Sequence, residues 1–254
     1  MIPLRYFIQF SYFGKAYHGW QNQPNAITVQ EFLERALSTL LREKVEVVGA
    51  GRTDAGVHAR QMFGHFDVDP ITDIADLVYR LNAFLPDDIA IQGIHPVAAD
   101  AHARFDALER TYEYWLVKEK DPFLFDHAHF VKHPLDVGAM NKAAKILLEY
   151  TDFECFSKSN TDVKTYNCDI RKAHWKIDED KWVFNIAADR FLRNMVRAVV
   201  GTLLDVGMGK MQAEDIHNII ASKDRGEAGV SVPAKGLYLT KVLYPKEIFD
   251  EQKG

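Results

Sequence analysis

One carboxylate stands among two guanidiniums and three glycines in the segment from Gly49 to Arg60. The carboxylate is Asp54, and the guanidiniums are those of Arg52 and Arg60. Glycine permits positive φ angles and close approach of another backbone, and arginine binds phosphates. An apolar run precedes the segment and an alternating run follows it, so we expect a loop between two strands. Such a composition is typical of a loop that brings a carboxylate against a polyanion.

A plain turn is the alternative interpretation of Asp54. The sequence Asp-Ala-Gly has Asp at the first position and Gly at the third, which suits a β-turn, and on Asp54 alone this interpretation is favoured. Two nucleotide-binding motifs are excluded by spacing. A dinucleotide fingerprint needs a third glycine where Asp54 stands, and a P-loop needs Lys followed by Ser or Thr near its end.

The nine residues from Gly51 to Ala59, Gly-Arg-Thr-Asp-Ala-Gly-Val-His-Ala, resemble the signature of the tRNA pseudouridine synthase A family. The resemblance implies that Asp54 is the catalytic residue and that tRNA is the substrate. The target base must leave its stack to react. The resemblance suggests that Arg52 enters the vacated space or holds the flanking phosphate. It also groups Arg60 and His58 with the RNA-binding residues.

A second motif, Arg110-Thr111-Tyr112-Glu113-Tyr114, also resembles the family. It implies that Tyr112 stacks on the uracil and helps to remove the proton on C5. A lone tyrosine in a strand is more often a half-buried core residue. Leu237, in a run similar to the family's closing strand, is implied to line the base pocket, although an apolar residue that opens a strand is normally core.

A third motif runs from Phe191 to Arg197. A guanidinium close to a carboxylate lowers the pKa of the carboxylate, so the resemblance implies that Arg197 keeps Asp54 ionised. Arg193 is assigned to RNA. The two arginines are four residues apart, and we expect them to share one face of a helix. The alternative is that both arginines are solvated or face phosphates.

The implied reaction breaks the bond from ribose C1′ to uracil N1, turns the base over and rejoins it through C5. It has no redox step and consumes no energy source, so we expect no cofactor. A conventional glycoside hydrolase uses two carboxylates, whereas the loop offers only Asp54. We expect no metal site, because His127 and His129 lack an obvious third ligand and a chance pair is favoured.

The chain has 254 residues and a net charge of −5, which neither proves nor excludes an RNA partner. Basic residues gather from Arg52 to Arg60, from Lys158 to Lys172 and from Arg190 to Arg197, so we predict one basic face. Its two cysteines imply no disulfide framework. No leader or membrane-length apolar run is present, so we expect a cytoplasmic protein without membrane contact.

The hydrophobic pattern predicts the order βαββαβ twice, an α+β chain built from two ferredoxin-like halves. We expect a mixed, mainly antiparallel sheet with a central cleft, and halves that span residues 1–103 and 104–254. In the first half we expect strands at Leu4 to Tyr12, Val45 to Ala50, Met62 to Val68 and Ile89 to Val97, with helices from Thr28 and from Ile74 to Leu81. In the second we expect strands at Leu108 to Val117, Ile170 to Ile177, Trp182 to Ala188 and Leu237 to Tyr244, and helices at Val137 to Tyr150 and Phe191 to Val206. The second half also has a short extended insertion at His127 to Lys132 and a short added helix at Ala213 to Ala221.

Thr28 and Glu31 form a capping-box pattern at the start of the first helix. Gly207 is expected to end the helix from Phe191 to Val206. The family resemblance implies action on uridines 38 to 40 of the tRNA anticodon stem-loop, and a homodimer. Two alternatives stay open: a non-catalytic RNA-binding module, and a hydrolase that acts on a nucleoside with one carboxylate.

Overall fold

The computed structural model describes residues 3–158, 163–178 and 180–250. The chain packs into two compact units, one formed by residues 1–108 with residues 239–254, and the other by residues 109–238. Residues 159–162, inside the predicted basic cluster from Lys158 to Lys172, lie outside the described residues. So does Glu179, between the predicted segments from Ile170 to Ile177 and from Trp182 to Ala188.

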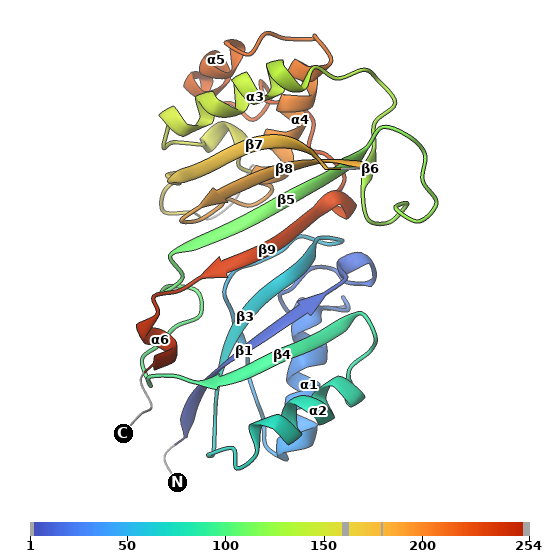
Figure 1. The fold of residues 1–254 in the computed structure, drawn as a ribbon. Helices are drawn as coiled ribbons and strands as arrows, with labels where there is room; N and C mark the ends of the chain where they lie inside the picture. The colour runs from blue at the N-terminus through green and yellow to red at the C-terminus, as the bar shows by residue number, and fades with distance from the viewer. Residues whose placement is uncertain (1–2, 159–162, 179, 251–254) are drawn as a thin grey trace. The chain divides into compact units, whose positions relative to one another are not determined.

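In the first unit the strands lie in the order β4, β1, β3, β9, with β1 antiparallel to both β3 and β4 (Figure 1). Each helix is flanked in sequence by strands, as the βαββαβ pattern predicts. The elements are β1 (Leu4–Tyr12), α1 (Val29–Leu41), β2 (Val48–Gly49), β3 (His58–Val68), α2 (Ile74–Phe84) and β4 (Ile89–Pro96).

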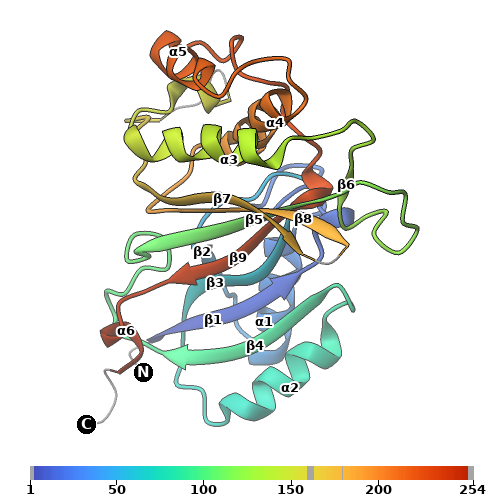
Figure 2. The same ribbon diagram turned by 45° about the horizontal axis from the view of Figure 1, so that its top comes forward.

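Helices α1 and α2 lie on one side of the sheet of this unit (Figure 2). The residues that meet there are fully buried, among them Phe10 of β1, Leu33 of α1 and Leu81 of α2. The first turn of α1 begins as predicted. Thr28 is its N-cap, and the Thr28 hydroxyl accepts the backbone N–H of Glu31 at 3.3 Å. A cap of this kind satisfies one N–H that has no partner inside the helix.

Strand β3 begins at His58, four residues before the predicted start at Met62. The additional residues pair with β1, since Ala59 lies opposite Tyr12. A polar residue at Arg60 and a loop signature ending at Ala59 conceal this strand in the sequence. The strand predicted from Val45 to Ala50 is shorter in the structure. It is β2, whose two residues, Val48 and Gly49, pair with His65 and Gly64.

In the second unit β8 lies between β5 and β7 and is antiparallel to both, and short β6 runs parallel to β5. The prediction of an α+β fold with mixed, mainly antiparallel strands is therefore confirmed. The elements are β5 (Glu109–Val117), β6 (His129–Phe130), α3 (Val137–Ile146), β7 (Ile170–Asp178), β8 (Lys181–Ala188), α4 (Met195–Gly207), α5 (Asp215–Ser222) and β9 (Leu237–Leu243). The last five residues of β9 belong to the first unit, as does α6 (Glu247–Asp250).

Helix α4 begins at Met195, so the predicted start at Phe191 is wrong. Asn194 has φ of 66°, a left-handed conformation that no helical residue adopts, and it separates Arg193 from the helix. The prediction that Arg193 and Arg197 share a helix face is therefore also wrong.

Gly207 is not the C-cap of α4 but its last residue. It is packed so closely that a β-carbon there would lie 2.5 Å from Sδ of Met140. The left-handed glycine that follows the helix is Gly209, with φ of 72°, and its N–H donates to the carbonyl of Val206 at 2.9 Å.

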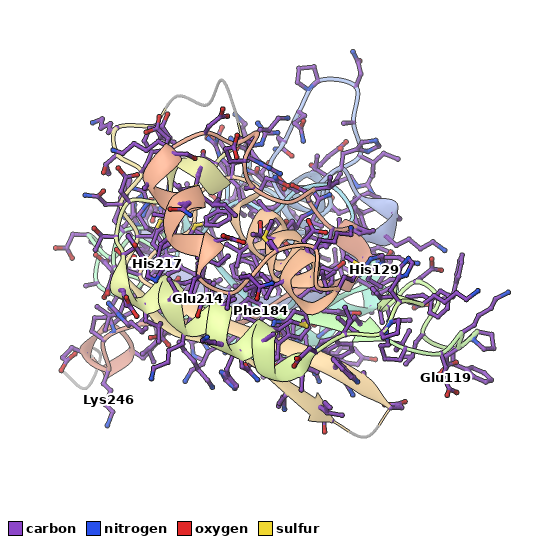
Figure 3. The ribbon with its side chains drawn as sticks, turned by 90° about the horizontal axis from the view of Figure 1, so that it is seen from above. Glu119, His129, Phe184, Glu214, His217 and Lys246 are labelled. Atoms are coloured by element: carbon purple, nitrogen blue, oxygen red, sulfur yellow. The ribbon has the colours of Figure 1, made fainter. Side chains whose placement is uncertain are left out.

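The core of the second unit is formed between its strands and α4. Phe184 of β8, labelled in Figure 3, is fully buried. Its ring packs against that of Trp175 of β7, with centroids 5.1 Å apart. In α4 nearly every residue is buried. Gly201 permits this packing, because a β-carbon there would lie 1.9 Å from the carbonyl oxygen of Val230. The segment after α5 therefore crosses α4 at backbone contact, which holds residues 228–233 against the helix.

Candidate functional site

Asp54 is half-buried and opens a tight turn in the loop between β2 and β3. Its carbonyl accepts the N–H of Val57 at 3.1 Å, and Gly56 has φ of 76°. Positive φ at the third position of a turn selects glycine, as in a type II turn. The turn that the sequence Asp-Ala-Gly suggests is thus present, and it fixes the backbone that carries the carboxylate.

An aromatic segment, residues 13–21 between β1 and α1, supports the Asp54 loop. The backbone N–H of Trp20 donates to the carbonyl of Thr53 at 3.4 Å, and Gly56 donates its N–H to the carbonyl of Tyr17 at 3.2 Å. The hydroxyls of Tyr12 and Thr53 lie 2.8 Å apart. These contacts bracket Asp54 on both sides, so the position of its backbone depends on a segment more than 30 residues earlier in the chain.

Glycines make this backbone contact possible. A β-carbon on Gly14 would lie 2.0 Å from the carbonyl oxygen of Val57, and one on Gly19 would lie 2.3 Å from that of Thr53. Gly19 also has φ of 91°. No residue with a side chain fits at either position without moving the Asp54 loop.

His58 is predicted to be among the RNA-binding residues, but it is only 1% exposed. Its Nδ1 accepts the backbone N–H of Gly14 at 2.9 Å, and the ring stacks on Phe13 with centroids 4.2 Å apart. An acceptor at Nδ1 places the ring proton of neutral histidine on Nε2. His58 therefore joins the end of the Asp54 loop to the aromatic segment. Arg52 and Arg60, by contrast, are exposed.

In the second unit, Arg197 lies in the first turn of α4, where its side chain and backbone both bind the same residue. Its Nε donates to the carbonyl of Val232 at 2.8 Å, and its own carbonyl accepts the N–H of Val232 at 3.2 Å. The neighbouring Pro233 carbonyl accepts the hydroxyl of Tyr114 at 2.9 Å. Burial raises the pKa of Tyr114, and the charge of Arg197 opposes part of that rise. Tyr114 is therefore a neutral donor that helps to hold the segment which orients Arg197.

Tyr112 lies on β5 opposite Ile186 and is half-buried. Its ring meets the edge of Phe191 at right angles, with centroids 5.2 Å apart. Arg193 is exposed, and its carbonyl accepts the N–H of Lys158 at 3.0 Å. Tyr112 and the segment before α4 therefore come together in this unit.

Leu237 begins β9 and is 5% exposed. Gly236 precedes it, and a β-carbon on Gly236 would lie 2.7 Å from the carbonyl oxygen of Trp115. Leu237 is thus fixed beside β5 by close backbone packing.

Several residues that position these groups were not identified from the sequence. Tyr12 ends β1, and Gly19 and Trp20 lie in the segment that follows it, but no pattern in the sequence indicates that they support the Asp54 loop. The Val232 carbonyl had no signal at all, because any residue supplies one. Asp189, which lies just before the third motif, holds the turn before Phe191. Its Oδ1 accepts the N–H groups of Asp169 and Arg190, both at 2.7 Å.

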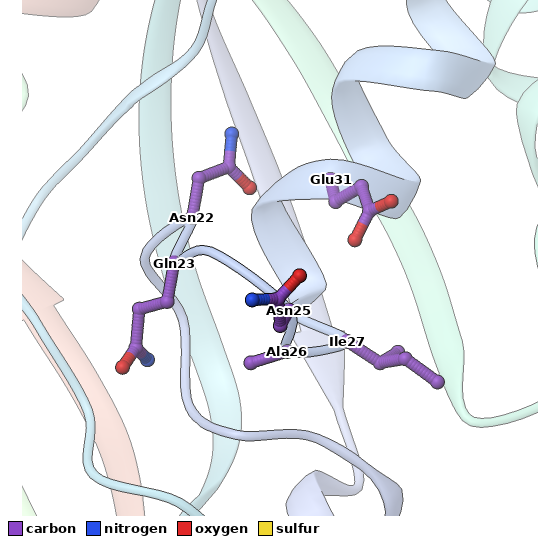
Figure 4. A pocket seen from close by; sticks show the side chains of 6 residues that line it. All are labelled: Asn22, Gln23, Asn25, Ala26, Ile27 and Glu31. Atoms are coloured by element: carbon purple, nitrogen blue, oxygen red, sulfur yellow. The ribbon is translucent and has the colours of Figure 1, made fainter.

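A shallow depression of the first unit is lined by loop residues after the aromatic segment and by Glu31 of α1 (Figure 4). It contains none of the predicted site residues. Among the described residues, no group of three or more His, Cys, Asp or Glu side chains is arranged to hold a metal ion. None of the helices in the described part of the chain combines the length and apolar character that crossing a membrane requires.

Comparison with known proteins identifies the same family that the sequence motifs resemble. A sequence model of the family described as tRNA pseudouridine synthase matches residues 8–106 and 143–245. The chain is 54% identical over 246 residues to the tRNA pseudouridine synthase A of Parabacteroides distasonis, which covers 96% of this chain and 98% of that protein. It is 53% identical over 249 residues to the protein of that name from Porphyromonas gingivalis, covering 96% and 99%. The segments matched by the family model contain the Asp54 loop and the helix of Arg197, whereas the strand of Tyr112 lies between them. The chain belongs to the tRNA pseudouridine synthase family.

Proposed function

We propose that this protein converts uridine to pseudouridine within tRNA and that Asp54 is its catalytic carboxylate. The observation that carries the proposal is the rigid support of the Asp54 loop, combined with an unbroken family signature from Gly51 to Ala59. A carboxylate that must meet one atom of a nucleotide needs a fixed backbone. The contacts of Thr53 and Gly56 provide that fixation on either side of Asp54.

The chemistry requires one carboxylate because the displaced uracil stays bound and is itself the group that returns. The bond from C1′ to N1 breaks, the base turns, a bond from C1′ to C5 forms, the proton on C5 is lost to solvent, and N1 takes up a proton. We assign Tyr112 to the base and to removal of that proton. Arg197 is assigned to Asp54, whose anionic form a guanidinium stabilises. Leu237 is assigned to the base pocket.

The RNA-binding residues in this proposal are Arg52, Arg60 and Arg193, whose exposed side chains suit contact with phosphates. Because the ring of His58 is buried, its assigned contribution to RNA binding is to hold the loop that carries Arg52. The substrate region is the anticodon stem-loop, with uridines 38 to 40 as targets. We further propose a homodimer in the cytoplasm, where tRNA is modified, with no metal or other cofactor.

Tritium at C5 of uracil tests the reaction. The protein is incubated with tRNA labelled at that position, and the label that enters the solvent is counted. Release in proportion to pseudouridine formed is expected. Binding without release would identify a non-catalytic RNA-binding module, and free uracil would identify a hydrolase. Transcripts with cytidine at each of positions 38 to 40 in turn test the target uridines, and sedimentation with and without tRNA tests the dimer.

A further inference from the structure

Three glycines lie in the segment from Gly49 to Arg60, and the fold accounts for two of them. A β-carbon on Gly49 would lie 2.5 Å from Nε1 of Trp20, so packing excludes a side chain there. Gly56 has φ of 76°, which residues with side chains rarely adopt. Both glycines are therefore needed for the loop to take its conformation.

Gly51 meets neither requirement. It is not among the glycines with positive φ. Within the described part of the chain, no heavy atom beyond those of Gly51 and its two chain neighbours lies within 4 Å of the place where its β-carbon would stand. A methyl group would therefore fit there without a steric clash. Since glycine loses more conformational freedom on folding than any other residue, the fold gives no reason for glycine at this position.

The backbone on either side of Gly51 is nevertheless held firmly. Ala50 is buried, and its N–H donates to the carbonyl of Phe63 at 2.7 Å. Thr53 is held by Tyr12 and Trp20, as described above. The bare peptide of Gly51 thus faces open space from a fixed position. The next side chain along the chain is the exposed guanidinium of Arg52.

We propose that Gly51 is where the sugar–phosphate backbone of the RNA substrate comes closest to the protein, and that RNA binding requires the absence of a side chain there. The inference rests on the proposed function. Gly51 adjoins Arg52 on the side away from Asp54, so an RNA strand that binds Arg52 through a phosphate and presents a nucleotide to Asp54 continues past the peptide of Gly51. A β-carbon on Gly51 would occupy the space of that strand and hold its phosphate away from Arg52. A free nucleoside has no flanking backbone and places no such demand on Gly51.

A graded series in the full-length protein tests the inference. Gly51→Ala and Gly51→Val are compared with wild type for thermal unfolding, tRNA affinity and single-turnover release of tritium. We expect an unchanged or slightly raised Tm. The Kd for tRNA should rise about 3-fold with alanine and about 30-fold with valine, in line with the cost of one or more misfitted carbon groups in a binding site. Release at saturating protein should fall less than affinity.

Gly49→Ala is the matched control, because the same added carbon meets Trp20 and should lower the Tm. If Gly51→Val binds tRNA as tightly as wild type, the inference is overturned. The proposed function still stands in that case, provided that the wild-type protein releases tritium. A lowered Tm for Gly51→Ala also overturns it, since the space is then not open. Loss of release with unchanged affinity overturns it as well, because the added carbon then acts on the loop and not on the RNA. Absence of tritium release by wild type overturns the proposed function, and with it this inference.

Discussion

The carbonyl oxygen of Thr53 lies so close to Gly19 that a β-carbon on Gly19 would be 2.3 Å from it, inside any normal non-bonded contact. Thr53 immediately precedes Asp54. The backbone of the proposed catalytic residue therefore rests on a glycine of the segment between β1 and α1. The position of the Asp54 loop therefore depends on the aromatic segment, which can support the loop only while position 19 has no side chain.

Gly19→Ala is expected to displace Thr53 and with it Asp54. Displacement of a catalytic group by about 1 Å costs on the order of 100-fold in rate. Single-turnover tritium release should fall by about that factor. Alanine at φ of 91° should also lower the free energy of unfolding by about 1 to 3 kcal/mol.

Gly209→Ala separates these two effects. Gly209 also has positive φ, at 72°, but no described atom lies within 4 Å of its β-carbon position. This variant should lose similar stability and keep the wild-type rate. Equal loss of rate in the two variants would mean that general destabilisation, and not the Thr53 contact, explains Gly19→Ala.

Arg52→Gln should weaken tRNA binding through the loss of one phosphate contact. Each phosphate that a cation neutralises releases condensed counterions, so the slope of log Kd against log salt should decrease by about 0.7 to 0.9. Titrations between low and moderate salt measure that slope. An unchanged slope would show that Arg52 does not bind a phosphate, and would favour insertion of its side chain into the space left by the base.

Arg197→Lys should be costly although it preserves the charge. Lysine lacks the Nε that donates to the Val232 carbonyl, and its flexible ammonium does not reproduce the planar guanidinium. We expect a loss of about 1 kcal/mol in stability and a fall in kcat of at least about tenfold. Urea unfolding and steady-state kinetics measure the two effects. Wild-type kcat with reduced stability would assign Arg197 a structural role only.

The pH dependence of stability should report on His65. Its pKa is lowered to about 4, first by burial and then by the charges of Arg5 and His102, against the opposing charges of Asp67 and Asp106. Between pH 4 and the ordinary histidine pKa of about 6.5, the unfolded chain binds this proton and the folded chain does not. Stability therefore rises with pH across this window and falls as the solution is acidified.

His65→Asn should flatten this dependence. The asparagine carbonyl can replace Nδ1, which accepts the N–H of Ala103 at 3.1 Å. The difference in unfolding free energy between pH 4.5 and pH 7 should shrink by on the order of 2 kcal/mol. Denaturant titrations at the two pH values measure it. An equally steep dependence in the variant would assign the effect to other groups, such as His95 or His102, whose pKa values burial also lowers.

Hydrophobic periodicity and capping patterns predicted the fold well. Apolar spacing located α1, and its N-cap at Thr28 follows from the hydroxyl and the spacing to Glu31. The errors occur where backbone conformation overrides composition. Asn194 adopts a left-handed conformation inside a segment of helical pattern, and Phe249 of α6 packs against Phe7 and Tyr244. Neither feature has a periodic signal.

Residue types in motifs led to the candidate site, whereas the packing around it was not predictable. Asp54, Tyr112 and Arg197 were chosen because their motifs resemble a family. The supports of these residues are mostly backbone groups, such as the carbonyls of Tyr17 and Val232, and every residue has a carbonyl. Glycine was the one useful indicator, because positions such as Gly19 show where another backbone must come close.

Asp54→Asn tests the central claim most directly. The amide has nearly the same shape as the carboxylate but carries no charge, so the loop and its hydrogen bonds should persist. The account predicts an unchanged Tm, a Kd for tRNA within about 3-fold of wild type, and single-turnover tritium release lowered by at least about 1,000-fold. Release at the wild-type rate by a variant that binds tRNA normally would contradict the assignment of Asp54 as the catalytic carboxylate.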